Sequence, residues 1–328
     1  MAPFFENANV WLLIDDRAGN KAQVMGVAQA LGCAYTVKSI TYNTLARLPN
    51  VVLGTSFKTL DTLSRATLIE PWPDLVIAAG RRTAPLAQHI KKLSGGKTKL
   101  VHIMYPGGRG DDDFSLIAVP RHDGLSKAPN RFEIIGAPHG VTAEVLDDAR
   151  KIWAEKFAHL PKPHIALIVG GSTKNRTFTP AMATDLGLQA RKLATDLGGS
   201  LLVTTSRRST PEATTALLDA LGDAPAHVFK WGDTGENPYF GYLALASYTI
   251  VTGDSVSMCC EAAASEAPLY IYAPKDLITD KHARFHQTLY EQGYAKPLHG
   301  NMGFKKWTHP PLNAAQDIAA EVKRRVID

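Results

Sequence analysis

Two stretches of this chain follow one plan: LVIAAGRRTAP at residues 75–85 and LLVTTSRRSTP at residues 201–211. Each begins with an apolar run typical of a buried strand and continues into two arginines, a hydroxyl residue and, two positions later, a proline. The hydroxyl residue can cap a helix, and proline is tolerated in the first turn of a helix. Both stretches therefore predict a strand, an arginine-bearing loop and a helix. Coincidence combined with ordinary capping explains the match about equally well, because dibasic pairs are common.

The same alternation of short apolar runs and helical patterns extends over the whole chain. Several runs are apolar without alternation, as expected of parallel strands that are covered on both faces. This pattern predicts an α/β fold with doubly wound parallel sheets and right-handed crossovers. The expected strands are 10–14, 35–39, 75–79, 100–104, 116–119, 132–135, 165–169, 201–205, 227–230, 249–251 and 269–272. The expected helices are 21–31, 85–93, 143–157, 180–197, 211–221, 255–264, 279–292 and 314–326.

The length of the chain predicts two domains, since 328 residues is about twice the size of a typical domain. The boundary is expected at Leu160-Pro161-Lys162-Pro163, where two prolines follow a helical segment and precede a new strand. The expected domains are thus 1–160 and 161–328, with the last helix, 314–326, a candidate to pack back on the first domain. Hydrophobic residues make up 45% and charged residues 20%, which excludes a disordered chain.

The charge balance is mildly basic: 36 Lys and Arg against 31 Asp and Glu give a net charge of +5. This excess fits an anionic ligand or surface, but without aromatic–basic interleaving it does not predict nucleic-acid binding. The cysteines, Cys33, Cys259 and Cys260, form neither a disulfide framework nor a zinc-site spacing. The apolar run 10–14 is too short for a signal peptide, and no run approaches the ~20 residues of a membrane span. We expect a cytoplasmic protein, with contact to a membrane surface left open, and no metal or cofactor.

Polar loops follow three expected strands in the first half. The first of these loops, residues 15–20, leads into a helix. Its backbone amides, the helix dipole and the charge of Arg17 favour binding of an anion. It is neither a G-x-G-x-x-G nor a Walker loop, which argues against a plain dehydrogenase or NTPase. A tight turn capped by Asp16 is the alternative. His122, beside a carboxylate, is a candidate general base or an ordinary loop histidine. The candidate residues here are Asp16, Arg17, Gly19, Asn20, Arg81, Arg82 and His122.

Two loops in the second half could hold a phosphate group. Gly170 and Gly171 permit close backbone approach, so the first loop is read as a phosphate cradle or a structural turn. In the second, Asp254 or Ser255 can cap a helix that carries Glu261, which could accept hydrogen bonds from ribose or be a solvated residue. The candidate residues here are Gly170, Gly171, Ser172, Thr173, Lys174, Arg207, Asp254, Ser255, Ser257 and Glu261.

Five segments resemble motifs of the mitochondrial fission protein family first named for elongated mitochondria in plants. The resemblance covers nearly the whole chain, and its most specific parts are the DRAGN loop and the DSVSM segment with the Glu261 that follows. The segments are DDRAGNKAQVMGVAQALG (15–32), VPRHDG (119–124), VGGSTKN (169–175), VTGDSVSMCCEAA (251–263) and KHARFHQTLYEQGYAKPL (281–298).

The family is similar in layout to GT-B glycosyltransferases, in which two Rossmann-like domains face a cleft and the second binds a nucleotide sugar. By comparison with the transferase that adds N-acetylglucosamine to peptidoglycan precursors, Gly170-Gly171-Ser172 matches the diphosphate loop, and Ser255 and Glu261 match the diphosphate and ribose segment. That enzyme's glycine-rich acceptor loop and its histidine are absent here. An epimerase would be expected to show a nicotinamide fingerprint, which is not visible.

The resemblance implies two alternative functions. In the first, a metal-independent glycosyltransferase, Arg207 and the 170–173 loop hold the diphosphate, and Asp16 or His122 deprotonates the acceptor. The acceptor, which a membrane surface or a lipid could carry, would face Arg17, Asn20, Arg81 and Arg82. In the second, the chain is a non-catalytic adaptor that binds a protein partner on a GT-B scaffold.

Overall fold

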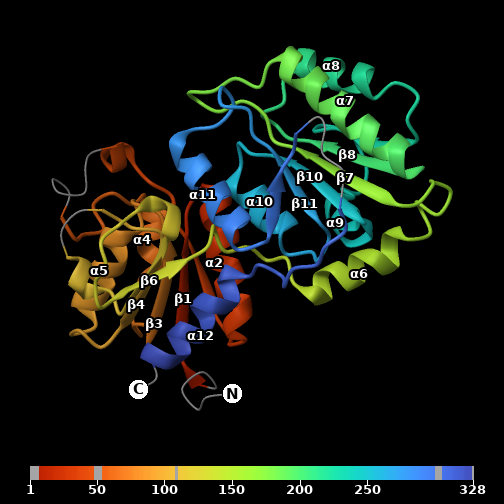
Figure 1. Cartoon of the computed structure of the whole chain (residues 1–328). Coiled ribbons are helices and arrows are strands. Elements are labelled where there is room, and N and C mark those ends of the chain that lie inside the picture. The colour runs from red at the N-terminus through yellow and green to blue at the C-terminus, as the bar shows by residue number, and fades with distance from the viewer. Residues whose placement is uncertain (1–6, 48–53, 108–109, 300–304, 327–328) are drawn as a thin grey trace. The chain divides into compact units, whose positions relative to one another are not determined.

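The computed structural model describes residues 7–47, 54–107, 110–299 and 305–326. Contacts divide the chain into two compact units, shown in Figure 1. Unit 1 comprises Met1–Gly140 and Asn313–Asp328, and unit 2 comprises Val141–Leu312. Each unit contains a six-stranded sheet in which every described pair of neighbouring strands is parallel. These sheets confirm the α/β class expected from the alternating pattern.

In unit 1 the strand order is β2-β1-β3-β4-β5-β6, so the order reverses between β1 and β3. This is the flavodoxin-like form of the doubly wound sheet with one further strand. The strands are β1 (Val10–Ile14), β2 (Thr36–Ser39), β3 (Leu75–Ala79), β4 (Lys99–Ile103), β5 (Leu116–Pro120) and β6 (Arg131–Ile134). The helices are α2 (Ala18–Leu31), α4 (Thr62–Thr67), α5 (Ala84–Leu93) and α12 (Ala314–Val326), with 3-10 turns η1 (Thr44–Arg47), η2 (Asp111–Asp113) and η3 (Arg121–Asp123).

Both faces of this sheet are buried, because successive strand residues point to opposite sides. Leu12 and Ile77 pack in one core with α2 and α12, whereas Leu13 and Val76 pack in a second core with α5. The C-terminal helix α12 therefore supplies part of the core of unit 1. Figure 1 shows it in the same unit as α2, against which it packs.

In unit 2 the strand order is β12-β11-β10-β7-β8-β9, which is the Rossmann order with its reversal between β7 and β10. The strands are β7 (His164–Val169), β8 (Ser200–Thr205), β9 (Ala226–Phe229), β10 (Tyr248–Thr252), β11 (Leu269–Tyr272) and β12 (Ala295–Pro297). The helices are α6 (Ala143–Trp153), α7 (Pro180–Leu197), α8 (Pro211–Leu221), α9 (Tyr239–Leu245), α10 (Val256–Ala262) and α11 (Asp280–Glu291).

The division between the units falls at Gly140/Val141, earlier than the expected joint at 160/161. Helix α6 accounts for the difference, because it packs on α9 of unit 2. The Arg150 guanidinium donates to the Ala244 carbonyl at 3.0 Å, and Trp153 lies so close to Gly241 that a Cβ there would be 2.4 Å from its ring. The prolines at 161 and 163 thus precede β7 inside unit 2. None of the helices in the described part of the chain combines the length and the apolar composition of a membrane span.

Candidate functional site

The candidate site lies at the carboxyl edge of the unit 2 sheet, where the strand order reverses. The register pairs Val169 with Thr205 and Ile168 with Val251, so β7, β8 and β10 end at the same level. The loops that follow them therefore begin side by side. In open α/β sheets, this edge at the reversal of strand order is where ligands bind.

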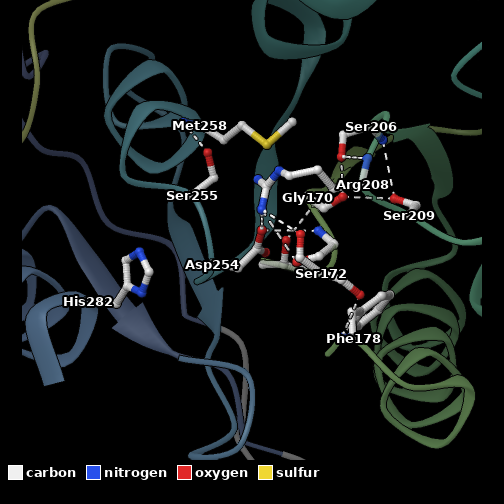
Figure 2. A network of polar contacts seen from close by, with 12 residues as sticks. Gly170, Ser172, Phe178, Ser206, Arg208, Ser209, Asp254, Ser255, Met258 and His282 are labelled. Carbon is white, nitrogen blue, oxygen red and sulfur yellow. Dashed lines mark hydrogen bonds and ion pairs between the residues drawn. The ribbon is translucent and has the colours of Figure 1, made fainter. Parts of the chain in front are cut away.

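Asp254, in the loop after β10, links these loops (Figure 2). Its side chain is fully buried, and its Oδ2 accepts the Gly171 N–H at 3.0 Å and lies 2.5 Å from Nη1 of Arg208. Its Oδ1 is buried without a hydrogen-bond partner among the described residues. A buried carboxylate is costly unless it is paired, so Arg208 has a structural reason to stay at this edge.

The Arg208 side chain nevertheless remains 33% exposed, so its guanidinium is both fixed and accessible. Nη1 lies 3.4 Å from the carbonyl oxygens of Gly171 and Ser172, in addition to its ion pair with Asp254. A guanidinium carries five N–H donors, and these contacts occupy one nitrogen. The arrangement therefore presents a pre-oriented cation at the rim of the sheet.

The loop after β7 is packed too closely for side chains at its first two positions. A Cβ on Gly170 would lie 2.4 Å from Asp254 Oδ2, and one on Gly171, whose φ is +133°, would lie 2.3 Å from the Arg208 carbonyl oxygen. The hydroxyl of Ser209 donates to the Gly170 carbonyl at 2.8 Å, and Ser206 makes a similar contact. The glycines thus serve close packing of the loops.

The amides of this loop are already engaged by protein acceptors. Gly170 N donates to Thr252 Oγ1 at 2.7 Å, Gly171 N to Asp254, and Ser172 N to the Arg208 carbonyl at 2.9 Å. Thr173 N donates to the Arg176 carbonyl at 2.7 Å. The backbone cradle expected from the sequence is therefore closed by internal hydrogen bonds, and an anion here would need side-chain donors.

The other predicted residues of this edge are placed as follows. Ser255 caps α10 by accepting the Met258 N–H at 3.4 Å, while Ser257, Lys174 and Arg207 are exposed. Sequence reasoning selected Arg207, whereas the structure gives the fixed position to Arg208. In unit 1 it is likewise the second arginine of the pair, Arg82, that contacts a buried aspartate, Asp15.

Glu261, the predicted ribose ligand, has a partner within the protein. Its Oε2 accepts the Tyr239 hydroxyl at 2.6 Å. Burial raises the pKa of Glu261, against the opposing effect of this hydrogen bond, and burial together with the adjacent carboxylate raises the pKa of Tyr239. One carboxylate oxygen is thus engaged.

The raised pKa of Glu261 predicts that this residue lowers the free energy of unfolding as the pH rises. A folded-state pKa above the unfolded value means that the stability contribution of Glu261 is lost as pH rises through the folded pKa. Relative to the wild type, Glu261→Gln should therefore gain stability between pH 4 and pH 7 in denaturant unfolding. Glu266→Gln, at an exposed residue, controls for the loss of one charge. A Glu261→Gln curve parallel to the wild-type curve would contradict the burial argument.

In unit 1, Asp15 and Arg82 form the corresponding pair after β1 and β3. Asp15 Oδ2 lies 3.0 Å from Arg82 Nη2, and its Oδ1 accepts from the Asn20 side chain and the Arg17 N–H, both at 3.1 Å. Arg82 also contacts Asp16. The side chain of Asn20 packs against Gly80, while Arg17, Gly19 and Arg81 are exposed. The structure therefore brings together Asp16, Asn20 and Arg82 of the predicted set.

The two predicted general bases are not brought together. His122 is buried in η3 after β5, with Nε2 3.8 Å from Asp123 Oδ1. In the sheet order β5 lies three strands from β1, about 14 Å at ~4.8 Å per strand. Asp16 and His122 thus remain separate alternatives. Among the described residues, no group of three or more His, Cys, Asp or Glu side chains could hold a metal ion.

Comparison with solved structures finds proteins that match nearly the whole chain, including both units. The UDP-GlcNAc 2-epimerase of Methanocaldococcus jannaschii matches with a TM-score of 0.55 at 12% identity, over 96% of this chain and 99% of that chain. MurG of Acinetobacter baumannii matches with a TM-score of 0.52 at 13% identity, over the same shares. The fold is therefore GT-B-like, and it does not by itself choose between transfer and epimerisation.

Sequence comparisons identify the family. A protein of Rickettsia prowazekii (strain Madrid E), Uncharacterized protein RP120, is 31% identical over 96% of this chain and 98% of its own length. Mitochondrial fission protein ELM1 of Arabidopsis thaliana is 27% identical over 84% of this chain and 69% of its own length. The family model described as Mitochondrial fission ELM1 matches residues 18–326. The chain therefore belongs to the mitochondrial fission ELM1 family.

Proposed function

We propose that unit 2 binds a nucleotide-diphosphate sugar at the carboxyl edge of its sheet, with the diphosphate on the Arg208 guanidinium. The observation that carries the proposal is the ion pair of Arg208 with the buried Asp254, at 2.5 Å. It holds an accessible guanidinium at the reversal of strand order, where such sheets bind ligands. Arginine suits this task because its planar fork can make two parallel hydrogen bonds to a phosphate group.

The surroundings of Arg208 add charge and hydroxyl groups. Lys174 and Arg207 are exposed in the adjoining loops, and the hydroxyls of Thr173, Ser255 and Ser257 complete the proposed diphosphate contacts. The free oxygen of Glu261 is proposed to accept from a ribose hydroxyl. Several structures with this fold come from proteins named for UDP sugars, including a Methanocaldococcus jannaschii epimerase solved with UDP-GlcNAc and UDP at a TM-score of 0.53. At 13% identity that likeness suggests the ligand class only.

Sugar transfer is the finer form of this proposal. Arg17, Arg81, Arg82 and Asn20 in unit 1 would bind an acceptor, which a membrane surface or a lipid could carry. Asp16 or His122 would take the proton of its hydroxyl group. The leaving diphosphate would be stabilised by arginine and lysine rather than by a metal ion, since preoriented positive groups supply the same electrostatic stabilisation.

Thermal unfolding in the presence of nucleotide sugars tests the binding. A ligand at 100 times its dissociation constant adds about 2.7 kcal/mol to the free energy of unfolding. UDP, GDP and their sugars should therefore raise the midpoint, whereas uridine, which lacks the diphosphate, should do so far less. A flat midpoint across the whole panel would contradict the proposal.

A second function, that of a non-catalytic adaptor, is favoured by one comparison. The Arabidopsis relative is named as a mitochondrial fission protein and aligns over 84% of this chain. An adaptor would bind its protein partner through a surface independent of the Asp254 edge. Asp254→Ala and Glu261→Ala should then leave partner capture intact, whereas loss of capture in both would favour a ligand-dependent site.

A further inference from the structure

A separate cavity of about 290 Å³ lies in unit 1, beside the loop after β1. Its walls include Asp16, Tyr42, Asn43, Thr44, Arg47 and Arg82. The two arginines come from different parts of the chain, one from η1 and one from the loop after β3. Thr41 and Ala46 also line the cavity, which therefore contains two cations, one carboxylate and several hydroxyl and amide groups.

The two carboxylates that hold Arg82 differ sharply in exposure. The Asp15 side chain is 1% exposed, while that of Asp16 is 71% exposed. Asp15 is fixed further by Asn20 and by the Arg17 N–H, each at 3.1 Å. An exposed ion pair is worth roughly 0–1 kcal/mol, whereas a buried one is costly to break. Asp15 is therefore a permanent partner of Arg82, and Asp16 is a replaceable one.

The guanidinium of Arg82 also has unused donors. Both carboxylates contact the same nitrogen, Nη2. Nε is buried and has no hydrogen-bond partner among the described residues. The Tyr42 ring lies 4.3 Å beneath the guanidinium carbon, and the pair keeps the fork in a fixed plane. The Tyr42 hydroxyl is likewise buried without a partner in the described part of the chain.

From this asymmetry we propose that the cavity is a binding site for an oxyanion, a phosphate or carboxylate group, for which Asp16 is a placeholder. The incoming anion replaces the Asp16 carboxylate on Arg82, while Asp15 keeps the guanidinium in position. Arg47 supplies the second positive charge at the cavity wall. The cavity shares Asp16 and Arg82 with the acceptor site proposed above. The proposal concerns unit 1 alone and does not depend on nucleotide binding by unit 2.

The proposal makes an unusual prediction: removing an acidic side chain from the site should strengthen binding. Asp16→Asn removes the competing carboxylate, and loss of an exposed ion pair of up to about 1 kcal/mol corresponds to up to about fivefold tighter binding. Calorimetric titration with inorganic phosphate, and separately with acetate, measures the effect and distinguishes a phosphate site from a carboxylate site. The full chain should carry Arg208→Ala throughout, so that phosphate does not bind at unit 2.

Asp112→Asn is the matched control, since Asp112 is exposed in η2 of the same unit and the net charge changes equally. Tighter binding in Asp16→Asn alone, and its loss in Arg82→Lys, would support the site. Equal tightening in Asp16→Asn and Asp112→Asn would reduce the effect to general electrostatics and overturn the proposal. Binding in Asp16→Asn that is absent, unchanged or weaker would also overturn it. Every variant shares the Arg208→Ala background and carries an intact Asp15, so the stability cost of that background is common to all the proteins compared.

Discussion

Replacing Arg208 by alanine should weaken UDP-sugar binding about 10- to 100-fold, because a hydrogen bond to a charged group contributes about 1.5–3 kcal/mol. Arg208 is the cation that the buried Asp254 fixes at the carboxyl edge of β7, β8 and β10. Isothermal titration calorimetry of the purified 328-residue chain measures the change directly. The loss should appear with UDP as well as with its sugars, since the proposed contact is to the diphosphate.

Arg207→Ala is the matched control for this variant. It removes the same charge from the adjacent, exposed residue, so general electrostatic attraction is reduced equally. If Arg207→Ala weakens UDP-sugar binding as much as Arg208→Ala does, long-range charge rather than the fixed guanidinium explains binding. If Arg207→Ala weakens binding more, the sequence-based assignment of Arg207 as the diphosphate ligand is the better one.

A structural side effect of Arg208→Ala can be separated from the loss of a ligand contact. The variant leaves Asp254 buried without its cation, which by itself lowers the free energy of unfolding. Combining it with Asp254→Asn removes the buried charge and keeps an oxygen to accept the Gly171 N–H. The double variant should regain stability without regaining affinity. Recovery of both would assign Arg208 a purely structural role.

The second large effect is expected from Gly171→Ala, which should lower the free energy of unfolding by about 2–5 kcal/mol and remove binding. The added Cβ would lie 2.3 Å from the Arg208 carbonyl oxygen, a backbone atom that cannot rotate away, and the φ of +133° is strained for alanine. Relief requires the loops after β7 and β8 to separate, which displaces Arg208. Urea unfolding and UDP titration of the same sample measure both consequences.

Gly198→Ala separates backbone strain from the steric clash. Gly198 ends α7 in the same unit with a φ of +62°, but nothing lies within 4 Å of an added Cβ. Gly198→Ala should lower the free energy of unfolding by about 1 kcal/mol and leave UDP affinity unchanged. A Gly171→Ala protein as stable as Gly198→Ala would show that the two loops are not locked together.

Most strands of the two sheets were predictable because they are continuous apolar runs. Leu75–Ala79 and Leu269–Tyr272 are observed with the expected bounds. Among the described residues, two α-helices and one strand were missed: α4 (Thr62–Thr67), α9 (Tyr239–Leu245) and β12 (Ala295–Pro297). They are short, and β12 is an edge strand of sequence AKP, so periodicity offers little signal.

The candidate site was predictable in its location but less so in its contacts. Strand ends followed by glycine or arginine mark the edge, and the motif placed a cation there in each unit. Which of Arg207 and Arg208 is held by Asp254 depends on loop dihedral angles that a dipeptide pattern does not determine. The pairing of Glu261 with Tyr239 spans 22 positions and arises only when α9 and α10 are placed by the fold. The engagement of the loop amides at residues 170–173 likewise needed the tertiary structure.

The central claim, that Arg208 receives the diphosphate of a nucleotide sugar, is tested most directly by a crystal structure of the wild-type protein with UDP-GlcNAc. We predict diphosphate oxygens within hydrogen-bond distance of the Arg208 guanidinium, with the Asp254 contact retained and the ribose near Glu261. Nucleotide bound elsewhere, with Arg208 still exposed to solvent, would contradict the account.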